Sequence, residues 1–256
     1  AAPGCDFPMT LQELETSTCA QNFYDVLDQL KRHVYARSER AFAAGDAARD
    51  AIKTRKALQQ RQRQIREFFP RSLGGLPPSD SALNARTTGV VEGDGFKVEK
   101  VIFESRPKHF VTADLYLPDN LKGRSAAVLF LCGHLGIAKQ HEQYQTVCQI
   151  LVRSGLIVLA QDPIGQGERH SYYESSHQTT TVACGVPEHE HAGCQCLPLG
   201  DSLARYFLHD AMRSVDYLMS RKEVDPDKIG VTGNSGGGTQ TCLMMMGDPR
   251  IAAAQG

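Results

Sequence analysis

Ser235 is the side chain in this sequence best suited to nucleophilic chemistry. It lies in Gly-Asn-Ser-Gly-Gly at residues 233–237, which fits the pattern G-x-S-x-G. A β-branched run at 229–232 precedes it, and an apolar stretch at 239–246 is predicted to form a helix. Strand, sharp turn and helix are the context of a nucleophile elbow, in which two flanking glycines make room for the strained turn. The turn is predicted to raise the serine hydroxyl above the sheet edge and to aim the Gly236 N–H at a developing oxyanion.

Two plainer interpretations of residues 233–237 remain: a glycine-rich turn that happens to contain serine, or a phosphate-binding loop. A phosphate loop is expected to end in Gly-Lys-Ser or Gly-Lys-Thr, and no lysine is present here. The sequence therefore favours the elbow.

A second loop, Leu-Cys-Gly-His-Leu-Gly at 131–136, follows the apolar run 126–131. An acyl-transfer enzyme needs a second backbone N–H for its oxyanion just past such a strand, and we assign it to His134. The alternative is a glycine-rich turn whose imidazole merely caps a neighbouring group. The His134 side chain is a less favoured general base, because in this architecture the base comes late in the chain.

Two further loops could surround such a site. Residues 161–169 could form a wall of it, although the favoured interpretation is structural, with Asp162 and Arg169 pinning a tight turn through charge-assisted hydrogen bonds. Residues 170–198 are longer than a routine connection and suggest a lid or binding loop. This insertion carries side chains capable of binding a metal, but their spacing matches no recognised zinc site, so polar lid residues or a local disulfide are favoured. They are Cys184, His189, His191, Cys194 and Cys196.

The first 70 residues are predicted to form a helical extension. Thr-Leu-Gln-Glu at 10–13 is a capping box, and it opens a helix with an apolar face. A second helix is expected from about Asp46 to just before Pro70. Its basic run could be a polyanion patch or a solvated helix face, and the latter is favoured. The apolar face comprises Phe23, Val26, Leu27, Leu30 and Val34, and the basic run comprises Arg49, Lys53, Arg55, Lys56, Arg61, Arg63 and Arg66.

Residues 71–256 have the pattern of an α/β domain. After a linker at 72–88, the runs 97–104 and 111–117 are predicted to form antiparallel strands. Continuous apolar runs at 126–131 and 156–160 are typical of strands buried on both faces. Helical stripes at 141–153 and 203–218 alternate with these strands, which indicates a mostly parallel sheet with helices on both faces.

Composition excludes several functional classes. The 256 residues carry 28 Lys and Arg against 29 Asp and Glu, so no net field attracts nucleic acid or an anionic membrane. No apolar run reaches the length of a membrane span. Eight cysteines show no regular disulfide framework, and the compartment and oligomeric state are not readable.

Several segments resemble the acetylxylan-esterase-like α/β-hydrolases, which are related to cephalosporin C deacetylases and dienelactone hydrolases. The segments are Gly-Gly-Leu-Pro-Pro at 74–78, Phe-Glu-Ser-Arg-Pro at 103–107, Tyr-Leu-Pro at 116–118, and the longer runs 161–169 and 224–238. The resemblance implies a serine esterase that acts on small acyl esters, such as acetyl groups on plant-wall sugars, without a cofactor or metal. It implies Ser235 as the nucleophile, with Gly236 and His134 as the oxyanion donors.

The departure from that family's pattern concerns the rest of the triad. The acid and the histidine are expected after the serine, yet only 256 − 235 = 21 residues follow it. We therefore expect the N-terminal part of a longer protein, truncated after the elbow, with little turnover by itself. Two alternatives remain: a prolyl-oligopeptidase-type peptidase, which a preceding propeller would support, and a non-catalytic binding module of the same fold.

Overall fold

The computed structural model describes residues 28–256, which form two compact units divided between Arg61 and Gln62. The predicted capping box at 10–13 and the apolar positions Phe23, Val26 and Leu27 lie outside the described residues. The boundary near residue 70 that the sequence suggests between extension and hydrolase domain stays a prediction.

Two helices come first in the described chain, α3 (Gln29–Asp50) and α4 (Arg55–Ser72). The expectation that the second helix begins near Asp46 is wrong, because Asp46 lies inside α3, where it pairs with Arg49 at 2.9 Å. The chain leaves the helix at Ala51, and the Thr54 hydroxyl accepts a hydrogen bond from the Ala57 N–H at 3.1 Å. A threonine cap of this kind starts a new helix, so α4 begins one residue later.

Pro70 does not end α4, contrary to the expectation from sequence, since the helix continues to Ser72. A proline this near the C-terminus removes only one hydrogen bond of the helix. Its carbonyl then accepts from the Gly75 N–H at 2.8 Å, and Gly74 and Gly75 adopt positive φ angles of 87° and 86°. Glycines in this conformation close the helix, which is why it ends here and not at the proline.

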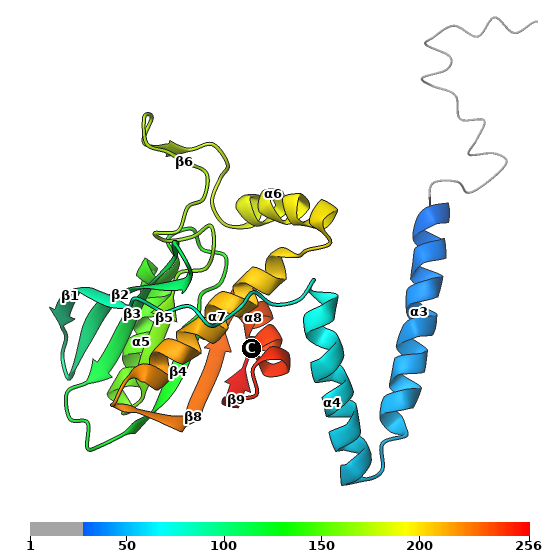
Figure 1. The fold of residues 1–256 in the computed structure, drawn as a ribbon, viewed down its shortest axis with the longest axis horizontal. Coiled ribbons are helices and arrows are strands. Elements are labelled where there is room, and N and C mark those ends of the chain that lie inside the picture. Colours follow the sequence, from blue (N-terminus) through cyan, green and yellow to red (C-terminus); the bar gives the residue numbers. More distant parts are fainter. Residues whose placement is uncertain (1–27) are drawn as a thin grey trace, which may run out of the picture. The chain divides into compact units, whose positions relative to one another are not determined.

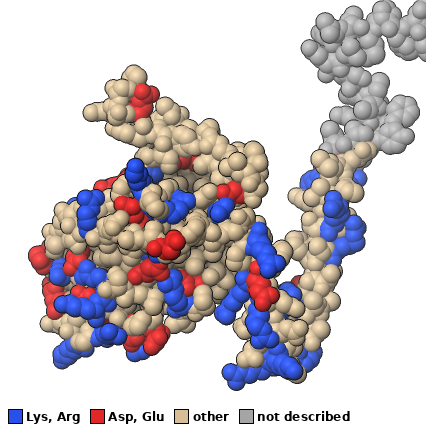
Figure 2. Space-filling view, viewed as in Figure 1, with Lys and Arg blue, Asp and Glu red and all other residues tan. Residues whose placement is uncertain are grey.

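The α4 helix has a strong excess of positive charge. Its basic side chains are exposed, with one acidic residue, Glu67, among them. Figure 2 shows these blue side chains along α4, whereas both signs are mixed over the surface of the part of the chain that follows it. Exposed basic side chains are expected both for a solvated helix face and for a polyanion patch. The basic residues are Arg55, Lys56, Arg61, Arg63, Arg66 and Arg71.

A seven-stranded mixed sheet dominates the second unit, in the order β1-β2-β3-β5-β4-β8-β9 (Figure 1). The pairs β1-β2, β2-β3 and β3-β5 are antiparallel. The strands β5, β4, β8 and β9 run parallel to one another. The predicted antiparallel start and parallel continuation are therefore confirmed. The strands are β1 (Arg86–Glu92), β2 (Phe96–Arg106), β3 (His109–Pro118), β4 (Ser125–Leu131), β5 (Ile157–Gln161), β8 (Val224–Gly233) and β9 (Ile251–Gln255).

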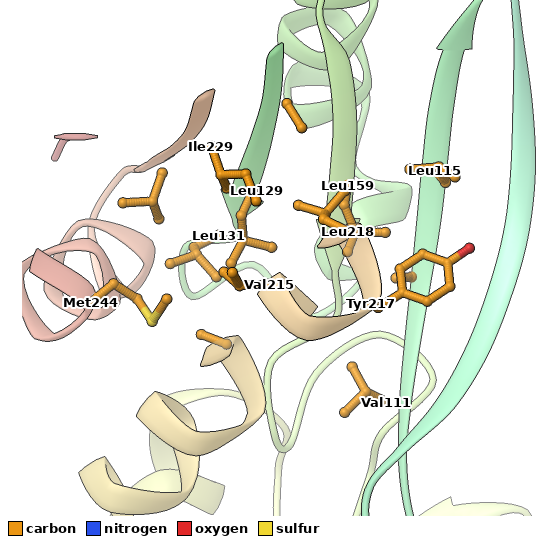
Figure 3. Close-up of a cluster of buried hydrophobic side chains, with 14 of the residues drawn as sticks. Val111, Leu115, Leu129, Leu131, Leu159, Val215, Tyr217, Leu218, Ile229 and Met244 are labelled. Atoms are coloured by element: carbon orange, nitrogen blue, oxygen red, sulfur yellow. The ribbon is translucent and has the colours of Figure 1, made fainter. Parts of the chain in front are cut away.

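Helices cover both faces of this sheet. Leu129 and Leu159 point to a cluster shared with α7 (Leu203–Ser220) and α8 (Gly236–Gly247), which Figure 3 shows in close-up. Their strand neighbours Phe130 and Val158 point the other way, to a cluster with α5 (Glu142–Arg153). Alternation with period two on strands buried on both sides produces this arrangement.

Two features were not predicted as elements. The β1 strand forms the sheet edge, pairs on one side only and is almost wholly exposed, so no apolar alternation marks it in the sequence. Its first three residues fall in the linker predicted at 72–88. The insertion at 170–198 contains a two-stranded ribbon, β6 (Tyr173–Glu174) with β7 (Thr179–Thr180), and the helix α6 (Val186–Cys196). Short 3₁₀ helices occupy Ala138–Gln140 and Leu197–Leu199.

The parallel strands determine where chemistry can collect. The carboxyl ends of β4, β5 and β8 are adjacent in register, with Leu131 beside Gln161 and Gly233. The loops that follow these three residues therefore meet at one edge of the sheet, where α/β folds place their ligands. Among residues 28–256, no helix combines the length and apolar character that a membrane crossing requires.

Candidate active site

Ser235 occupies the turn between β8 and α8 in a strained conformation. Its φ of 53° and ψ of −119° lie where residues with a side chain are rarely found, and it is the N-cap residue of α8. Such a conformation costs about 1–3 kcal/mol and persists only where the surroundings impose it. The residue is exposed at the sheet edge. Strand, strained turn and helix are confirmed as predicted.

The two flanking glycines are required by the close approach of strand and helix. A Cβ on Gly237 would overlap the Leu131 carbonyl, and one on Gly233 would overlap the same carbonyl and the backbone of Gly237. The steric reason for the G-x-S-x-G pattern is thus confirmed. The glycines let α8 start directly against β4, which fixes where the serine points.

Backbone donors are available on both sides of the serine. The N–H groups of Gly236 and His134 form no hydrogen bond within the described residues. Gly236 is also the first residue of the twelve-residue helix α8, so the helix dipole adds partial positive charge there. Both predicted oxyanion donors, His134 in the loop after β4 and Gly236 at the start of α8, therefore lie at the same sheet edge as Ser235, with free N–H groups.

The His134 side chain comes closer to the serine than the sequence suggested. Its Nδ1 lies 3.3 Å from the Ser235 Oγ. Its ring also packs on Gly236, where an added Cβ would come within 2.6 Å of the imidazole. A histidine from the loop after β4, in place of one late in the chain, is therefore the hydrogen-bond partner of the serine among the described residues.

Gln166 holds the loop that carries His134. Its side-chain Nε2 donates to the carbonyls of Gly133 and Leu135, both at 2.7 Å, and only 1% of the residue is exposed. The backbone on either side of His134 is thereby fixed from the neighbouring loop. The Gly167 N–H adds a bond to the Gly136 carbonyl at 2.8 Å.

A pocket of about 330 Å³ opens beside the serine loop. Side chains of α7 and α8 give it an apolar wall, and the insertion contributes His189 from α6. Its volume is at the small end of the range for ligand sites. The lining residues are His134, Gln166, His189, Leu203, Ala204, Phe207, Gly236, Thr239, Gln240 and Leu243.

Asp162 and Arg169 pin the loop at 161–169 through charge-assisted hydrogen bonds, as predicted. Arg169 donates to the backbone carbonyl of Asp162 at 3.0 Å and also pairs with the buried Asp210 at 2.6 Å. The Asp162 carboxylate accepts from the Lys139 Nζ at 2.5 Å and the Thr112 hydroxyl at 2.7 Å. Partners on other elements therefore add to the contact within the loop.

Lys139 is a buried cation among acidic groups. It is 4% exposed and bonds both Asp162 and Glu168, the latter at 2.6 Å. Burial acts to lower the pKa of Lys139, but the neighbouring carboxylates outweigh it and raise that pKa above its ordinary value. The lysine therefore stays charged and ties the second loop to the chain before α5.

The remaining polar residues of the insertion serve different contacts. His191 is exposed and bonds Gln195 at 2.9 Å, and His170 lines a separate hollow. The three cysteines of the insertion, Cys184, Cys194 and Cys196, are free thiols. Within residues 28–256 no three His, Cys, Asp or Glu side chains are grouped so as to hold a metal.

Two residues of this region could not be assigned a role from the sequence. Gln166 lies between two glycines in 161–169, which indicates a tight turn but not the clamp that its side chain forms. Lys139 gave no signal, since nothing in its local sequence distinguishes a buried lysine from an exposed one.

The fold and the elbow together define an α/β-hydrolase architecture. The sequence model of the acetyl xylan esterase family (AXE1) matches residues 43–255. The chain belongs to this acetyl xylan esterase family. No curated protein matches the sequence.

Solved structures agree on the fold. A proposed acetyl xylan esterase from Bacteroides fragilis NCTC 9343 is 22% identical with a TM-score of 0.66, covering 79% of this chain and 54% of that one. The methylesterase BT1017 is 24% identical with a TM-score of 0.67, covering 86% and 45%. A glucuronoyl esterase from Solibacter usitatus is 16% identical with a TM-score of 0.54, covering 79% and 59%. The chain thus spans about half the length of these structures.

Proposed function

We propose that this protein is a serine carboxylesterase that cleaves acyl esters of carbohydrates through an acyl-enzyme on Ser235. Membership of the acetyl xylan esterase family supports hydrolysis of carboxylic esters. The observation that carries the serine mechanism is the strained φ of 53° at Ser235, directly before the free N–H of Gly236. A strained, exposed serine at a helix N-terminus is suited to act as a nucleophile. Backbone strain of this kind is found mainly at functional sites.

The proposed reaction has two halves. The Ser235 Oγ gives its proton to the histidine that acts as general base and bonds to the ester carbonyl carbon, and the oxyanion accepts hydrogen bonds from the N–H groups of Gly236 and His134. Collapse of this intermediate breaks the bond to the alcohol, which leaves with the proton held by that histidine. Water then gives a proton to the histidine and attacks the acyl-enzyme, and the same proton returns to the Ser235 Oγ as the carboxylic acid is released.

We further propose that the acid and histidine of a complete triad lie outside these 256 residues. The support is that the chain spans about half the length of the solved esterases. His134 then assists the serine only partly, since among the described residues no carboxylate bonds its other ring nitrogen. The 256 residues alone are expected to react with an active-site label much faster than they turn over an ester.

The first experiment combines the intact mass of the natively expressed protein, fluorophosphonate labelling and turnover of p-nitrophenyl acetate. We expect labelling at Ser235, and Ser235→Ala should abolish it and lower turnover at least about 10³-fold. The control is Ser220→Ala, at the exposed end of α7, where the hydroxyl bonds only the Tyr217 carbonyl. A full-length protein that ignores the label would favour a binding module over an esterase.

A further inference from the structure

The helix α6 delivers one histidine, His189, to the pocket beside Ser235. Three contacts fix it there against the loop 163–171. The Gly185 N–H donates to the Gly165 carbonyl at 2.9 Å, and the buried Glu188 accepts from the Ser171 N–H at 3.0 Å. The His189 Nε2 lies 2.7 Å from the Ile164 carbonyl. The imidazole is therefore held in place and is not a freely moving surface side chain.

The contact with Ile164 decides the tautomer of His189. A carbonyl oxygen can only accept, so Nε2 must carry the hydrogen, and in the neutral ring Nδ1 keeps a lone pair. Burial lowers the pKa of His189 and outweighs the Ile164 carbonyl, which acts to raise it, so the ring is neutral near pH 7. Among the described residues Nδ1 has no hydrogen-bond partner, and it is not enclosed by protein.

The surroundings of this acceptor suit an uncharged polar ligand. Phe207 packs edge-on against His189 with ring centroids 5.0 Å apart, and Leu203 and Leu243 extend the apolar wall. Among the described residues that line the pocket, none is Lys, Arg, Asp or Glu. An unpaired acceptor beside apolar surface fits a hydroxyl on a ring with an apolar face, as in a neutral sugar. A uronate carboxylate would have no cation to pair with in this pocket. Its oxygens only accept hydrogen bonds, so they would face the lone pair of the His189 Nδ1 without a proton between them.

We propose that His189 is a specificity-determining residue whose Nδ1 accepts a hydrogen bond from a hydroxyl of the sugar that carries the ester. This deepens the proposed function and rests on it. The ester carbonyl lies at Ser235, and the sugar extends into the pocket between α6 and α7. Esters of simple alcohols, which lack the hydroxyl, gain nothing from this residue.

Kinetics of the full natural chain test the proposal with two substrates, an acetylated methyl β-xyloside and p-nitrophenyl acetate. His189→Phe should lower kcat/KM for the xyloside about tenfold more than it lowers kcat/KM for p-nitrophenyl acetate. His189→Asn should retain much of the selectivity, because an amide can both donate to Ile164 and accept from the sugar. His191→Phe, on the same helix but exposed, is the matched control. Equal losses on both substrates would overturn the proposal and leave a structural role for His189.

A binding measurement separates this proposal from the esterase mechanism. Methyl β-xyloside is titrated by NMR into Ser235→Ala, with and without His189→Phe. We expect about tenfold weaker binding in the double variant. Unchanged binding, or no binding to Ser235→Ala, would overturn the role of His189. If the native protein hydrolyses neither ester while this difference in binding persists, the esterase proposal fails and the sugar site stands.

Discussion

At the scale of single residues, His134 holds a position that neither of its predicted roles describes fully. Its backbone N–H is free for an oxyanion, and its Nδ1 lies 3.3 Å from the serine hydroxyl. We predict that His134→Ala, which keeps the N–H and removes the imidazole, slows fluorophosphonate labelling of Ser235 about tenfold. A base without an orienting carboxylate should give less than the 10²–10⁴-fold typical of general-base catalysis.

The matched control for His134→Ala is His141→Ala. His141 follows the same loop, and its ring accepts a hydrogen bond from the Gln143 N–H at the start of α5. Labelling rates, measured by intact mass against time, decide between the two roles of His134. A rate unchanged in His134→Ala would mean that the residue acts through its backbone alone.

A second residue-scale prediction concerns Asp114 on β3. Burial raises the pKa of Asp114 to about 6 from an ordinary 3.8, and the charges of Asp162 and Glu168 add to the effect while Lys139 opposes it. The native state thus binds the Asp114 proton more tightly than the unfolded chain does. The free energy of unfolding should therefore fall by about 1–3 kcal/mol as pH rises from about 4 to above 6.

Replacing Asp114 with Asn should remove this dependence. The variant is expected to be more stable than the native protein at pH 7.5 and equal to it near pH 4, by urea unfolding at both pH values. Asp119→Asn, exposed just beyond the same strand, is the control. A variant that loses stability at pH 7.5 would show that the Asp114 carboxylate is favourably paired there.

At the scale of elements, the strands and helices were largely predictable because burial leaves a periodic trace. Runs such as 126–131 and 156–160 are apolar on consecutive positions since helices cover both faces. The exposed edge strand β1 left no such trace. The start of α4 was also missed, because a charged residue such as Asp46 can cap one helix or pair inside another.

The candidate site was predictable only in part, for a related reason. The elbow has a local signature, because the glycines that clear the Leu131 carbonyl on the neighbouring strand all lie within five residues of sequence. The residues around the elbow have no such local signature. Gln166 comes from another loop, and its role depends on contacts with the carbonyls of Gly133 and Leu135. His189 comes from α6, and its role depends on the Ile164 carbonyl. Tertiary contacts of this kind cannot be inferred from spacing along the chain.

The Gln166 clamp yields an element-scale prediction. Gln166→Glu would place a carboxylate, which only accepts, against two buried carbonyls, whereas Gln166→Ala merely removes two donors. We expect the alanine variant to lose about 1–3 kcal/mol of stability and the glutamate variant to lose more. Both should lower kcat on p-nitrophenyl acetate, since the backbone around His134 loosens.

The control for Gln166 is Gln145→Ala, where a half-buried residue on α5 donates through its amide to a single carbonyl, that of Gln140, just before the helix. Urea unfolding and initial rates are measured on the same samples. Full activity in Gln166→Glu would show that the loop after β4 holds its shape without the clamp.

At the scale of the whole molecule, the family match and the hydrophobic core begin at different residues. The match starts at residue 43, inside α3, yet α3 has no buried side chain. Phe69 near the end of α4 is the first residue of the main core cluster, which continues through the sheet to Met244. We propose accordingly that the stability of the fold depends on the chain from about residue 69 onward, close to the boundary near 70 suggested by the sequence.

Adjacent phenylalanines on α4 test this proposal with the same chemical change. Phe69 is 8% exposed and Phe68 is 68% exposed. Phe69→Ala should lower the free energy of unfolding by about 3 kcal/mol, because it empties a packed site, while Phe68→Ala should change it by less than about 0.5 kcal/mol. Phe42→Ala, on the exposed surface of α3, should behave like Phe68→Ala. If Phe42→Ala or Phe68→Ala instead matched Phe69→Ala in urea unfolding, the helices would bury surface against a partner, such as a second copy or further chain, and the stable fold would begin well before residue 69.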